Sequence, residues 1–292
     1  MKKMSKLNYA IEKVKELPTL PVIANRVQEM LYNPKTNISD LAKIIEKDQS
    51  IATKILKLVN SAFYSLPEHV TNISQAITLL GFKNISQIVM TLSVFDTLRS
   101  RNKGIFDRRQ FWLHSIATGI IGKRIAIETK TKDPDDVFTS CLLHDIGKVF
   151  MDGFLKDEFK EIIKLADEKR ISFYQAENEL FDINHSMIGE WIARTWNLPI
   201  HVIAGIKHHH EPFEERAGLS FSRDISVDIV VVADVASRKS RIGNNGDGKG
   251  YKPVLKNEML KRLAVSREDI DIYINDLSKE IREFEILLNM AV

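Results

Sequence analysis

The sequence of 292 residues predicts an all-α protein. Apolar residues recur at helical spacing in most segments that lie between turn residues. Only residues 224–236, DISVDIVVVADVA, are rich enough in Val and Ile to suggest a strand. No other segment alternates convincingly between apolar and polar residues, so a strand there would lack a partner. We therefore expect a buried helix in this segment.

Five helices are expected in the first hundred residues. Apolar residues such as Val22, Val27 and Leu31 define the spacing of the first helix. Ser39 is the expected N-cap of the second helix, and Gly81 is expected to end the fourth. The segments are residues 20–31, 38–61 (two helices), 72–82 and 84–98.

A polar stretch from Arg99 to Asp107 separates these helices from a second half, which is also predicted to be helical. Pro134 fits the first turn of one helix after Asp133, and Ser266 is the expected N-cap of the last helix. The expected segments are 111–129, 134–151, 157–169, 172–181, 184–196, 199–210, 224–236 and 266–290. The two halves are expected to be packed helical subdomains.

Composition indicates an ordinary globular protein, with 44% hydrophobic and 28% charged residues. A net charge of +3 without a basic stripe argues against nucleic acid as a partner. No segment has the character of a membrane span, and the N-terminus lacks the apolar core of a signal peptide. Because Cys141 is the single cysteine, no intrachain disulfide can form, and we expect a cytoplasmic protein.

The heptapeptide LLHDIGK, residues 142–148, is the first chemical signal. A His–Asp pair followed by Gly and Lys often begins a metal-dependent phosphohydrolase site, although the same letters can persist for packing alone. On one helix His144 and Asp145 would lie about 100° apart, and both could reach an ion over that face. Divalent ions that activate water bind neutral imidazoles and carboxylates, so further ligands must come from neighbouring helices.

The chain has eight histidines, and several lie where a ligand could. His114 shares a buried helix face with Ala117, although a lone histidine there is more often a hydrogen-bonded core residue. Asp234 lies in an apolar run, where an isolated carboxylate costs several kcal/mol unless it is paired or bound to metal. The other histidines are His69 (expected in a loop), His201 (surface or core), His185, and the run His208, His209 and His210, which a polar helix end would also explain.

Two further patterns are interpreted as structural. Residues 243–250, GNNGDGKG, nearly match a phosphate-binding loop, but Gly250 replaces the required hydroxyl residue. The segment also lacks a preceding strand and a following helix, so we interpret it as a flexible loop. Cys141 is interpreted as a small buried residue and not as a ligand.

The order His, His-Asp, His, His-His, Asp resembles that of the HDOD family, a branch of the HD metal-dependent phosphohydrolase superfamily. The resemblance covers roughly residues 17–240. It rests on LPTLPVIANRV, DQSIATKILKLVNSAFYS, ISQAITLLGFKNISQIVM, FWLHS, CLLHDIGK, HSMIGEWIARTWNLP and VVVADVASR. It implies an N-terminal helical bundle (residues 20–100) packed on an HD-like metal-site subdomain (105–240), with a Gly-rich loop and C-terminal helices in residues 241–292.

Similarity to the HD-GYP phosphodiesterases implies one or two divalent ions of the iron, manganese, nickel or zinc class. One ion would be held by His114, His144, Asp145 and Asp234, and a second by His185, His209 and His210, with Asp145 bridging. Asp145 would orient the attacking water, and Lys148 would face a substrate phosphate. The chain has no Gly-Tyr-Pro loop after its paired histidines, and Gln110 stands one turn before His114. These departures argue against cyclic-dinucleotide recognition and against a third metal.

Two functions follow from this resemblance. In the first, the protein is a bacterial signal-transduction output or regulatory module, which binds metal and has a nucleotide as a candidate ligand. It would pass a signal to partner proteins in trans through the N-terminal bundle. In the second, it is an active metal-dependent phosphohydrolase or phosphodiesterase acting on a nucleotide or cyclic nucleotide. The first half, without catalytic candidates, favours the module, whereas the full ligand set favours the enzyme.

Overall fold

The computed structural model describes residues 19–277, except for 32, 34, 61–65, 67, 99–106 and 132, and it also describes residue 281. Every regular element in this part of the chain is a helix, and it contains no strand, so the all-α prediction is confirmed. Most of the predicted polar stretch from Arg99 to Asp107 and the end of the predicted C-terminal helix lie outside the described residues.

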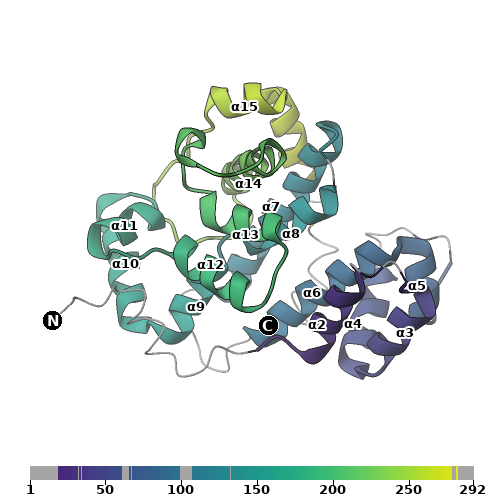
Figure 1. The fold of residues 1–292 in the computed structure, drawn as a ribbon. Coiled ribbons are helices and arrows are strands. Elements are labelled where there is room, and N and C mark those ends of the chain that lie inside the picture. Colours follow the sequence, from purple (N-terminus) through teal and green to yellow (C-terminus); the bar gives the residue numbers. More distant parts are fainter. Residues whose placement is uncertain are drawn as a thin grey trace. The chain divides into compact units, whose positions relative to one another are not determined.

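Two compact units make up the described chain, one containing α2 to α6 and the other α7 to α15. In Figure 1 the first is coloured purple to blue and the second teal to yellow. The helices of the first unit are α2 (Val22–Leu31), α3 (Ile38–Glu46), α4 (Gln49–Val59), α5 (Ile73–Leu80) and α6 (Phe82–Thr97). Those of the second are α7 (Arg108–Glu128), α8 (Pro134–Leu143), α9 (Ile146–Phe154), α10 (Lys156–Lys169), α11 (Phe173–Leu180), α12 (His185–Thr195), α13 (Ile200–His208), the 3₁₀ helix η1 (Phe213–Glu215), α14 (Phe221–Ser240) and α15 (Asn257–Leu263).

The first unit is built around an aliphatic core. Leu41 and Ile45 of α3 and Ile55 of α4 are all fully buried, because each helix turns its apolar face inward. Helix α6 packs against α2, α4 and α5. Within the described residues no single helix has both the length and the hydropathy to cross a membrane. The pair α5 and α6 passes on length and composition together, but it bends by 118° at its break.

Helix ends in the first unit follow local capping rules, with one correction. The side chain of Asn37 accepts a hydrogen bond from the Asp40 backbone N–H, so Asn37 is the N-cap of α3. The predicted cap, Ser39, therefore lies inside the helix, and that prediction is wrong. Gly81 ends α5 as predicted, and its φ of 86° suits a residue without a Cβ.

Helix α7 is buried along most of its length in the second unit, and α8 and α14 pack against it. Helix α13 packs on α8 and α12, and α12 packs on α9. Residues 224–236 lie within α14, so the helix prediction for this segment is confirmed. Pro134 occupies the first turn of α8, and Ser266 caps the last described helix by accepting from the Asp269 N–H, both as predicted.

The segment 134–151 is predicted to be one helix, but it forms two, α8 and α9. His144 and Asp145 lie in the turn between them, and the Lys148 N–H donates to the Asp145 carbonyl at 2.9 Å across that turn. Between Pro134 and this turn the sequence contains no Gly or Pro that would signal a break in the helix. The two side chains therefore project from a turn and not from one continuous helical face.

Candidate metal centre

Three of the predicted ligands meet where α7, α8 and α14 pack together. His114 comes from α7, His144 directly follows α8, and Asp234 lies in α14. Asp234 Oδ1 is 3.1 Å from His114 Nε2 and 3.7 Å from His144 Nε2. All three side chains are buried, and one ligand atom from each lies within 4.8 Å of the others. We call these three residues group one.

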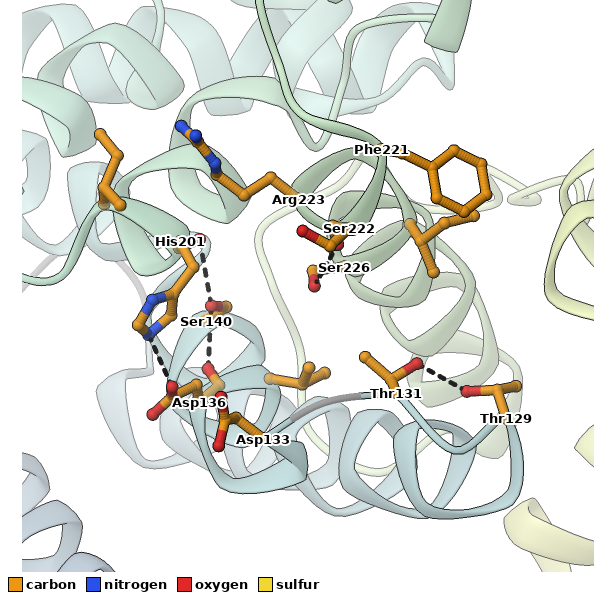
Figure 2. Close-up of a pocket in the computed structure, with 13 residues that line it drawn as sticks. Thr129, Thr131, Asp133, Asp136, Ser140, His201, Phe221, Ser222, Arg223 and Ser226 are labelled. Carbon is orange, nitrogen blue, oxygen red and sulfur yellow. Dashed lines mark hydrogen bonds and ion pairs between the residues drawn. The ribbon is translucent and has the colours of Figure 1, made fainter.

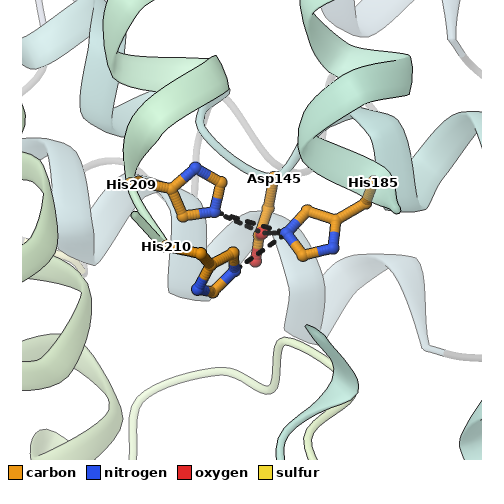
Figure 3. Close-up of side chains that lie close together, drawn as sticks. All are labelled: Asp145, His185, His209 and His210. Carbon is orange, nitrogen blue, oxygen red and sulfur yellow. Dashed lines mark hydrogen bonds and ion pairs between the residues drawn. The ribbon is translucent and has the colours of Figure 1, made fainter. Parts of the chain in front are cut away.

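The other four predicted ligands form a second cluster, shown in Figure 3. Asp145 Oδ1 lies 3.0 Å from His185 Nε2 and 3.5 Å from His209 Nε2. His210 Nε2 lies 3.0 Å from His185 Nε2. One ligand atom from each of the four lies within 4.8 Å of the others. We call Asp145, His185, His209 and His210 group two.

Asp145 joins the two groups. Its Oδ1 faces group two, whereas its Oδ2 lies 3.3 Å from His144 Nε2 of group one. The His144 ring also packs edge-on against the rings of His114 and His209, with centroid distances of 5.5 and 5.0 Å. The seven predicted side chains thus lie together, and Asp145 has the position expected of a bridging carboxylate.

Close packing of α9 on α12 brings group two together. A Cβ at Gly147 would lie 2.0 Å from the His185 carbonyl oxygen, so only glycine fits at this position. At Gly189 of α12, a Cβ would lie 2.6 Å from the Ile206 side chain of α13. The glycine of LLHDIGK therefore has a packing role, which is to let His185 approach Asp145.

Three histidine rings are oriented by hydrogen bonds from their outer nitrogen to a neutral acceptor. A backbone carbonyl can only accept, so a ring nitrogen bonded to one carries the proton and leaves Nε2 with a lone pair. The Ser237 hydroxyl donates its proton to the His114 carbonyl. The lone pairs of the hydroxyl oxygen can then accept a hydrogen bond from the ring of His114. The Nδ1 pairs are His144 with Cys141 O (2.6 Å), His209 with Ile206 O (2.8 Å) and His114 with Ser237 Oγ (3.1 Å).

His185 has a charged partner instead. Its Nδ1 lies 2.6 Å from Glu177 Oε2, and its backbone N–H donates to Glu177 Oε1 at 2.7 Å. Burial alone would lower the pKa of His185, but the Glu177 carboxylate raises it above its usual value. Glu177 was not among the residues predicted from the sequence. The available signal was a carboxylate on the apolar face of α11, next to Ala176 and four residues after Phe173, both buried.

Burial keeps three of the other imidazoles neutral. It lowers the pKa of His209 to about 3, and burial with a neighbouring histidine also lowers the pKa of His114 and of His210. Burial disfavours the ionised form of Asp145, but His144 and Lys148 hold the pKa of that carboxyl below its usual value. Neutral imidazoles and an ionised carboxylate are the forms that bind a divalent cation.

The cluster contains buried polar atoms that suit a cation. His114 Nε2, His144 Nε2 and Asp145 Oδ1 are buried without a hydrogen-bond partner. Asp234 Oδ1 approaches His114 Nε2 to 3.1 Å, but the contact is not a hydrogen bond. Two nitrogens bound about 2.1 Å from one ion lie about 3.0–3.4 Å apart. His185 Nε2 lies 3.0 and 3.3 Å from the Nε2 atoms of His210 and His209, so these donors fit a divalent ion.

Two cationic side chains border the cluster. Lys148 is 1% exposed, and its Nζ donates to Asp145 Oδ2 at 2.7 Å and to the Asn245 carbonyl at 3.1 Å. Its contact with a substrate phosphate stays a prediction, and two of its three donors are engaged within the protein. Arg238, which the sequence analysis missed, donates from Nε to Asp234 Oδ1 at 2.9 Å and from Nη2 to Oδ2. Its spacing of one helical turn from Asp234 was the available signal.

Residues 243–250, the Gly-rich segment, are hydrogen-bonded to residues beside both groups. Asp247 Oδ1 accepts from the Phe173 N–H at 2.8 Å, and its Oδ2 accepts from Arg238 Nη1 at 2.6 Å. Burial would raise the pKa of Asp247, but Arg238 and Lys148 lower it, so the carboxylate stays ionised. The segment therefore connects α11, which contacts group two, with α14, which carries Asp234.

Glycines let this segment lie directly on neighbouring backbone. A Cβ at Gly243, whose φ is 75°, would lie 2.2 Å from the His114 backbone nitrogen. A Cβ at Gly248 would lie 2.0 Å from the Ala166 carbonyl oxygen. The segment is a loop, as predicted, and these contacts hold it against the neighbouring helices. The contacts that hold it are long-range, and local sequence does not reveal them.

The remaining predicted positions lie outside both groups. His69 is exposed in a loop, as expected, and Cys141 is fully buried and is not one of the clustered ligands. His201 Nε2 lies 3.3 Å from Asp136, and His208 Nδ1 lies 2.5 Å from Glu211. Of the run of three histidines, only the second and third therefore join the cluster.

A cavity of about 420 Å³ lies elsewhere in the second unit, beside the first turns of α8, α13 and α14 (Figure 2). His201 and Asp136 line one side of it, and Phe221 lies on another. His209 is eight residues further along the chain than His201, about 12 Å at the helical rise per residue. No residue of group one or group two lines this cavity, so it is separate from the candidate metal centre.

Comparison with known proteins finds the HDOD domain family over residues 17–212. The crystal structure of an HDOD domain protein with unknown function from Geobacter sulfurreducens is similar, with a TM-score of 0.78, 29% identity and 98% of each chain covered. A candidate signal transduction protein from Marinobacter aquaeolei VT8 has a TM-score of 0.75 and 17% identity, covering 100% of this chain and 62% of that one. A candidate metal-dependent phosphohydrolase from Shewanella amazonensis SB2B has a TM-score of 0.62 and 20% identity, covering 96% of each. The last two similarities show a shared fold.

Two curated relatives are similar in sequence. An uncharacterized protein of Treponema pallidum (strain Nichols) is 26% identical over 200 residues, which cover 68% of this chain and 38% of that protein. The uncharacterized protein YuxH of Bacillus subtilis (strain 168) is 28% identical over 156 residues, covering 52% of this chain and 36% of that protein. The matched part of the chain thus spans less than two fifths of the length of either relative.

Proposed function

The chain belongs to the HDOD family, and on this premise we propose that it is a signal-transduction output or regulatory protein with a metal centre in its second unit. The enclosure of the centre carries this proposal. His144, Asp145 and His185 are at most 1% exposed, and the cations beside them are engaged with protein carboxylates. A bare ion needs less room to enter such a site than a nucleotide does.

The proposed metal ligands come from five separate places in the second unit. These are α7, the turn after α8, the start of α12, the turn after α13, and α14. An ion that binds all of them stabilises one arrangement of these helices, because its binding free energy favours the state in which the ligands are together. This coupling between metal binding and helix arrangement supports a regulatory role.

The donor set supports two adjacent ions that share Asp145. Group one with Asp145 Oδ2 would hold one divalent ion, and group two would hold the other through Asp145 Oδ1. Imidazole-rich sites suit iron, manganese, nickel or zinc. The signal would pass in trans to partner proteins through the first unit. That unit supplies no member of either group, which is consistent with a role in protein contacts.

A metal-dependent phosphohydrolase is the second candidate, and the position of Lys148 favours it. Lys148 Nζ lies 2.7 Å from Oδ2 of Asp145, the carboxylate that joins the two groups, where it would offset negative charge that develops on a phosphoryl group. Similarity of fold to the candidate phosphohydrolase from Shewanella amazonensis also supports it. A bound divalent ion supplies an acidified water and polarises phosphoryl oxygens. Asp145 would orient that water, and Lys148 would hold Asp145 in place.

Metal analysis followed by an activity assay separates these candidates. Protein purified without chelators is expected to contain one or two equivalents of divalent metal, and His144→Ala or Asp145→Ala is expected to lose it. Loaded protein is then tested with a generic aryl phosphodiester in the presence of manganese or ferrous iron. Metal-free wild-type protein would contradict the metal centre. Turnover that wild-type protein shows and both variants lack would favour the phosphohydrolase over the regulatory module.

A further inference from the structure

The two donor groups differ in the charged residues that are bonded to their ligands. In group one, both oxygens of Asp234 accept from the guanidinium of Arg238. In group two, the ligand with a charged partner is His185, and that partner is the carboxylate of Glu177. A cation that enters group one meets a positive side chain on its carboxylate, whereas a cation in group two meets an additional negative charge behind its imidazole.

The two oxygens of Asp145 show the same asymmetry. Lys148 Nζ donates to Oδ2, the oxygen that faces His144 of group one. Oδ1, which faces His185 and His209, has no hydrogen-bond partner. Each carboxylate oxygen that could serve group one therefore already has a protein cation bonded to it. The carboxylate oxygen that faces group two has none.

Glu177 is placed to act on one ligand alone. Both of its oxygens bond to His185, one at the ring Nδ1 and one at the backbone N–H, and it is 0% exposed. It lies on α11, which contributes no residue to either group. The same helix places Tyr174 against His210, with the rings stacked at 4.2 Å, and Phe173 beside the His185 ring at 5.9 Å. Helix α11 thus supports group two without supplying a ligand.

A carboxylate on the outer nitrogen of an imidazole has two consequences for its inner nitrogen. It holds the proton on Nδ1, so that Nε2 keeps its lone pair, and it makes Nε2 a stronger donor to a metal. Removing such a partner typically costs about 10- to 100-fold in metal affinity. Among the clustered histidines, His144, His209 and His114 have only neutral partners at Nδ1.

We propose that Glu177 is a positioning residue that makes group two the tighter of the two metal positions, so that one ion fills group two before a second fills group one. The second ion binds more weakly because it must share Asp234 with Arg238 and Asp145 Oδ2 with Lys148. This inference rests on the proposed metal centre and goes beyond it, since it assigns the order of filling and the residue that sets it.

The experiment is a Mn²⁺ titration of metal-stripped protein, with free Mn²⁺ measured by its electron paramagnetic resonance signal. Wild-type protein is expected to bind in two phases, a tight and a weak equivalent. Glu177→Gln is expected to weaken the tight phase about 10- to 100-fold and to change the weak phase by less than about threefold. The side-chain amide of Gln would donate to Nδ1 and move the ring proton to Nε2, where it blocks the ligand atom.

Glu179→Gln is the matched control. Glu179 lies two residues further along α11, about half exposed, and pairs with Lys169 away from both groups. The same charge is removed from the same helix, so both binding phases should stay within about twofold of wild type. Circular dichroism of both variants before metal addition checks that each is folded.

A measurement on wild-type protein keeps the inference testable if Glu177→Gln does not fold. Long-range ¹H–¹⁵N correlation spectra of the metal-free protein report which nitrogen of each ring carries the proton. A proton on Nδ1 of His185 is expected, and a neutral ring with its proton on Nε2 would contradict the inference.

The outcomes separate this inference from the proposed function. Wild-type protein that binds neither Mn²⁺ nor Zn²⁺ would contradict the metal centre itself, and the inference with it. Wild-type protein that binds two ions while Glu177→Gln binds them equally well would overturn only the role of Glu177. Loss of the weak phase in place of the tight one would overturn the proposed order of filling.

Discussion

The two units of this chain bury different kinds of side chain. Among the described residues of the first unit, the buried polar ones are Ser86, Thr91 and Ser93, all uncharged. The second unit buries charged and titratable groups, including Asp145, Lys148 and Glu177. Apolar burial stabilises the first unit without specifying individual partners. In the second unit each buried charge needs a particular partner, so its arrangement is tied to individual contacts and, in our proposal, to metal ions.

Acidification should produce the largest difference in folding stability between the two units. In EDTA-treated protein, the second unit is expected to lose stability as the pH falls from about 6.5 toward 4. The folded pKa of His209 is about 3, below its usual value of about 6.5, so the unfolded state binds more protons in this range. Stability therefore falls by roughly 1.4 kcal/mol per pH unit for this residue. His114 and His210, whose pKa values are also lowered, act in the same direction.

His185 does not oppose this trend. Its folded pKa is raised, so the stability it contributes is fully present below about pH 6.5 and is lost only as the pH rises through the folded value. Urea denaturation at several pH values measures the effect. Tryptophan fluorescence reports the second unit alone, because the three tryptophans are Trp112, Trp191 and Trp196. A fluorescence midpoint that does not change between pH 7 and pH 5 would contradict the prediction.

Leu41→Ala should destabilise the first unit without affecting the metal centre of the second. Leu41 is fully buried in α3, so the substitution should cost the first unit about 3 kcal/mol through lost apolar burial and a cavity. Metal content should not change, because the first unit supplies no member of either donor group. Denaturation followed by circular dichroism should show the loss. Leu79→Ala, at a 49% exposed position of α5, is the control and should have little effect. Loss of metal from Leu41→Ala would show that the units are coupled.

Gly147→Ala should weaken group two and destabilise the second unit by about 2 kcal/mol. The new Cβ would lie 2.0 Å from the His185 carbonyl oxygen, so α9 and α12 must separate. Gly153→Ala in the same helix is the matched control, since its nearest neighbouring atom, Nη2 of Arg108, would be 3.6 Å away at ordinary van der Waals contact. That variant should be neutral or gain up to about 1 kcal/mol from helix propensity. Equal metal affinity in both variants would contradict the packing role of Gly147.

Asp247→Asn should have the smallest effect, about 1 kcal/mol of stability in the second unit. The amide can still accept from the Phe173 N–H but cannot replace the charged bond to Arg238. Thermal unfolding measures this loss, with Asp167→Asn as a control at a more exposed contact to the same segment. Hydrogen exchange of residues 243–250 should also increase. Unchanged exchange there would show that Arg238 does not hold the segment.

Local sequence was sufficient for the helices and for the family. Periodic apolar residues predicted the all-α class, and Gly81, Pro134 and Ser266 were placed correctly at helix ends, because capping depends on neighbours within four residues. The N-cap of α3 was wrong by two residues, since Asn37 and Ser39 are both good caps and local preference does not separate them. The break at His144 was missed for lack of a Gly or Pro signal there.

The resemblance to the HD-GYP phosphodiesterases was enough to name the seven clustered side chains, which the fold brings into two adjacent groups. Their partners were not predictable in this way. Glu177 on His185, Arg238 on Asp234 and the Gly-rich segment on Lys148 were found only in the structure.

Local patterns and the family resemblance therefore predicted the helical class, most helix positions and the identity of the clustered residues. A helix relates residues three or four positions apart, whereas the bond from Lys148 to Asn245 joins residues 97 positions apart. Such a contact exists only once the intervening helices have packed, so the packed fold sets the charge around each donor group.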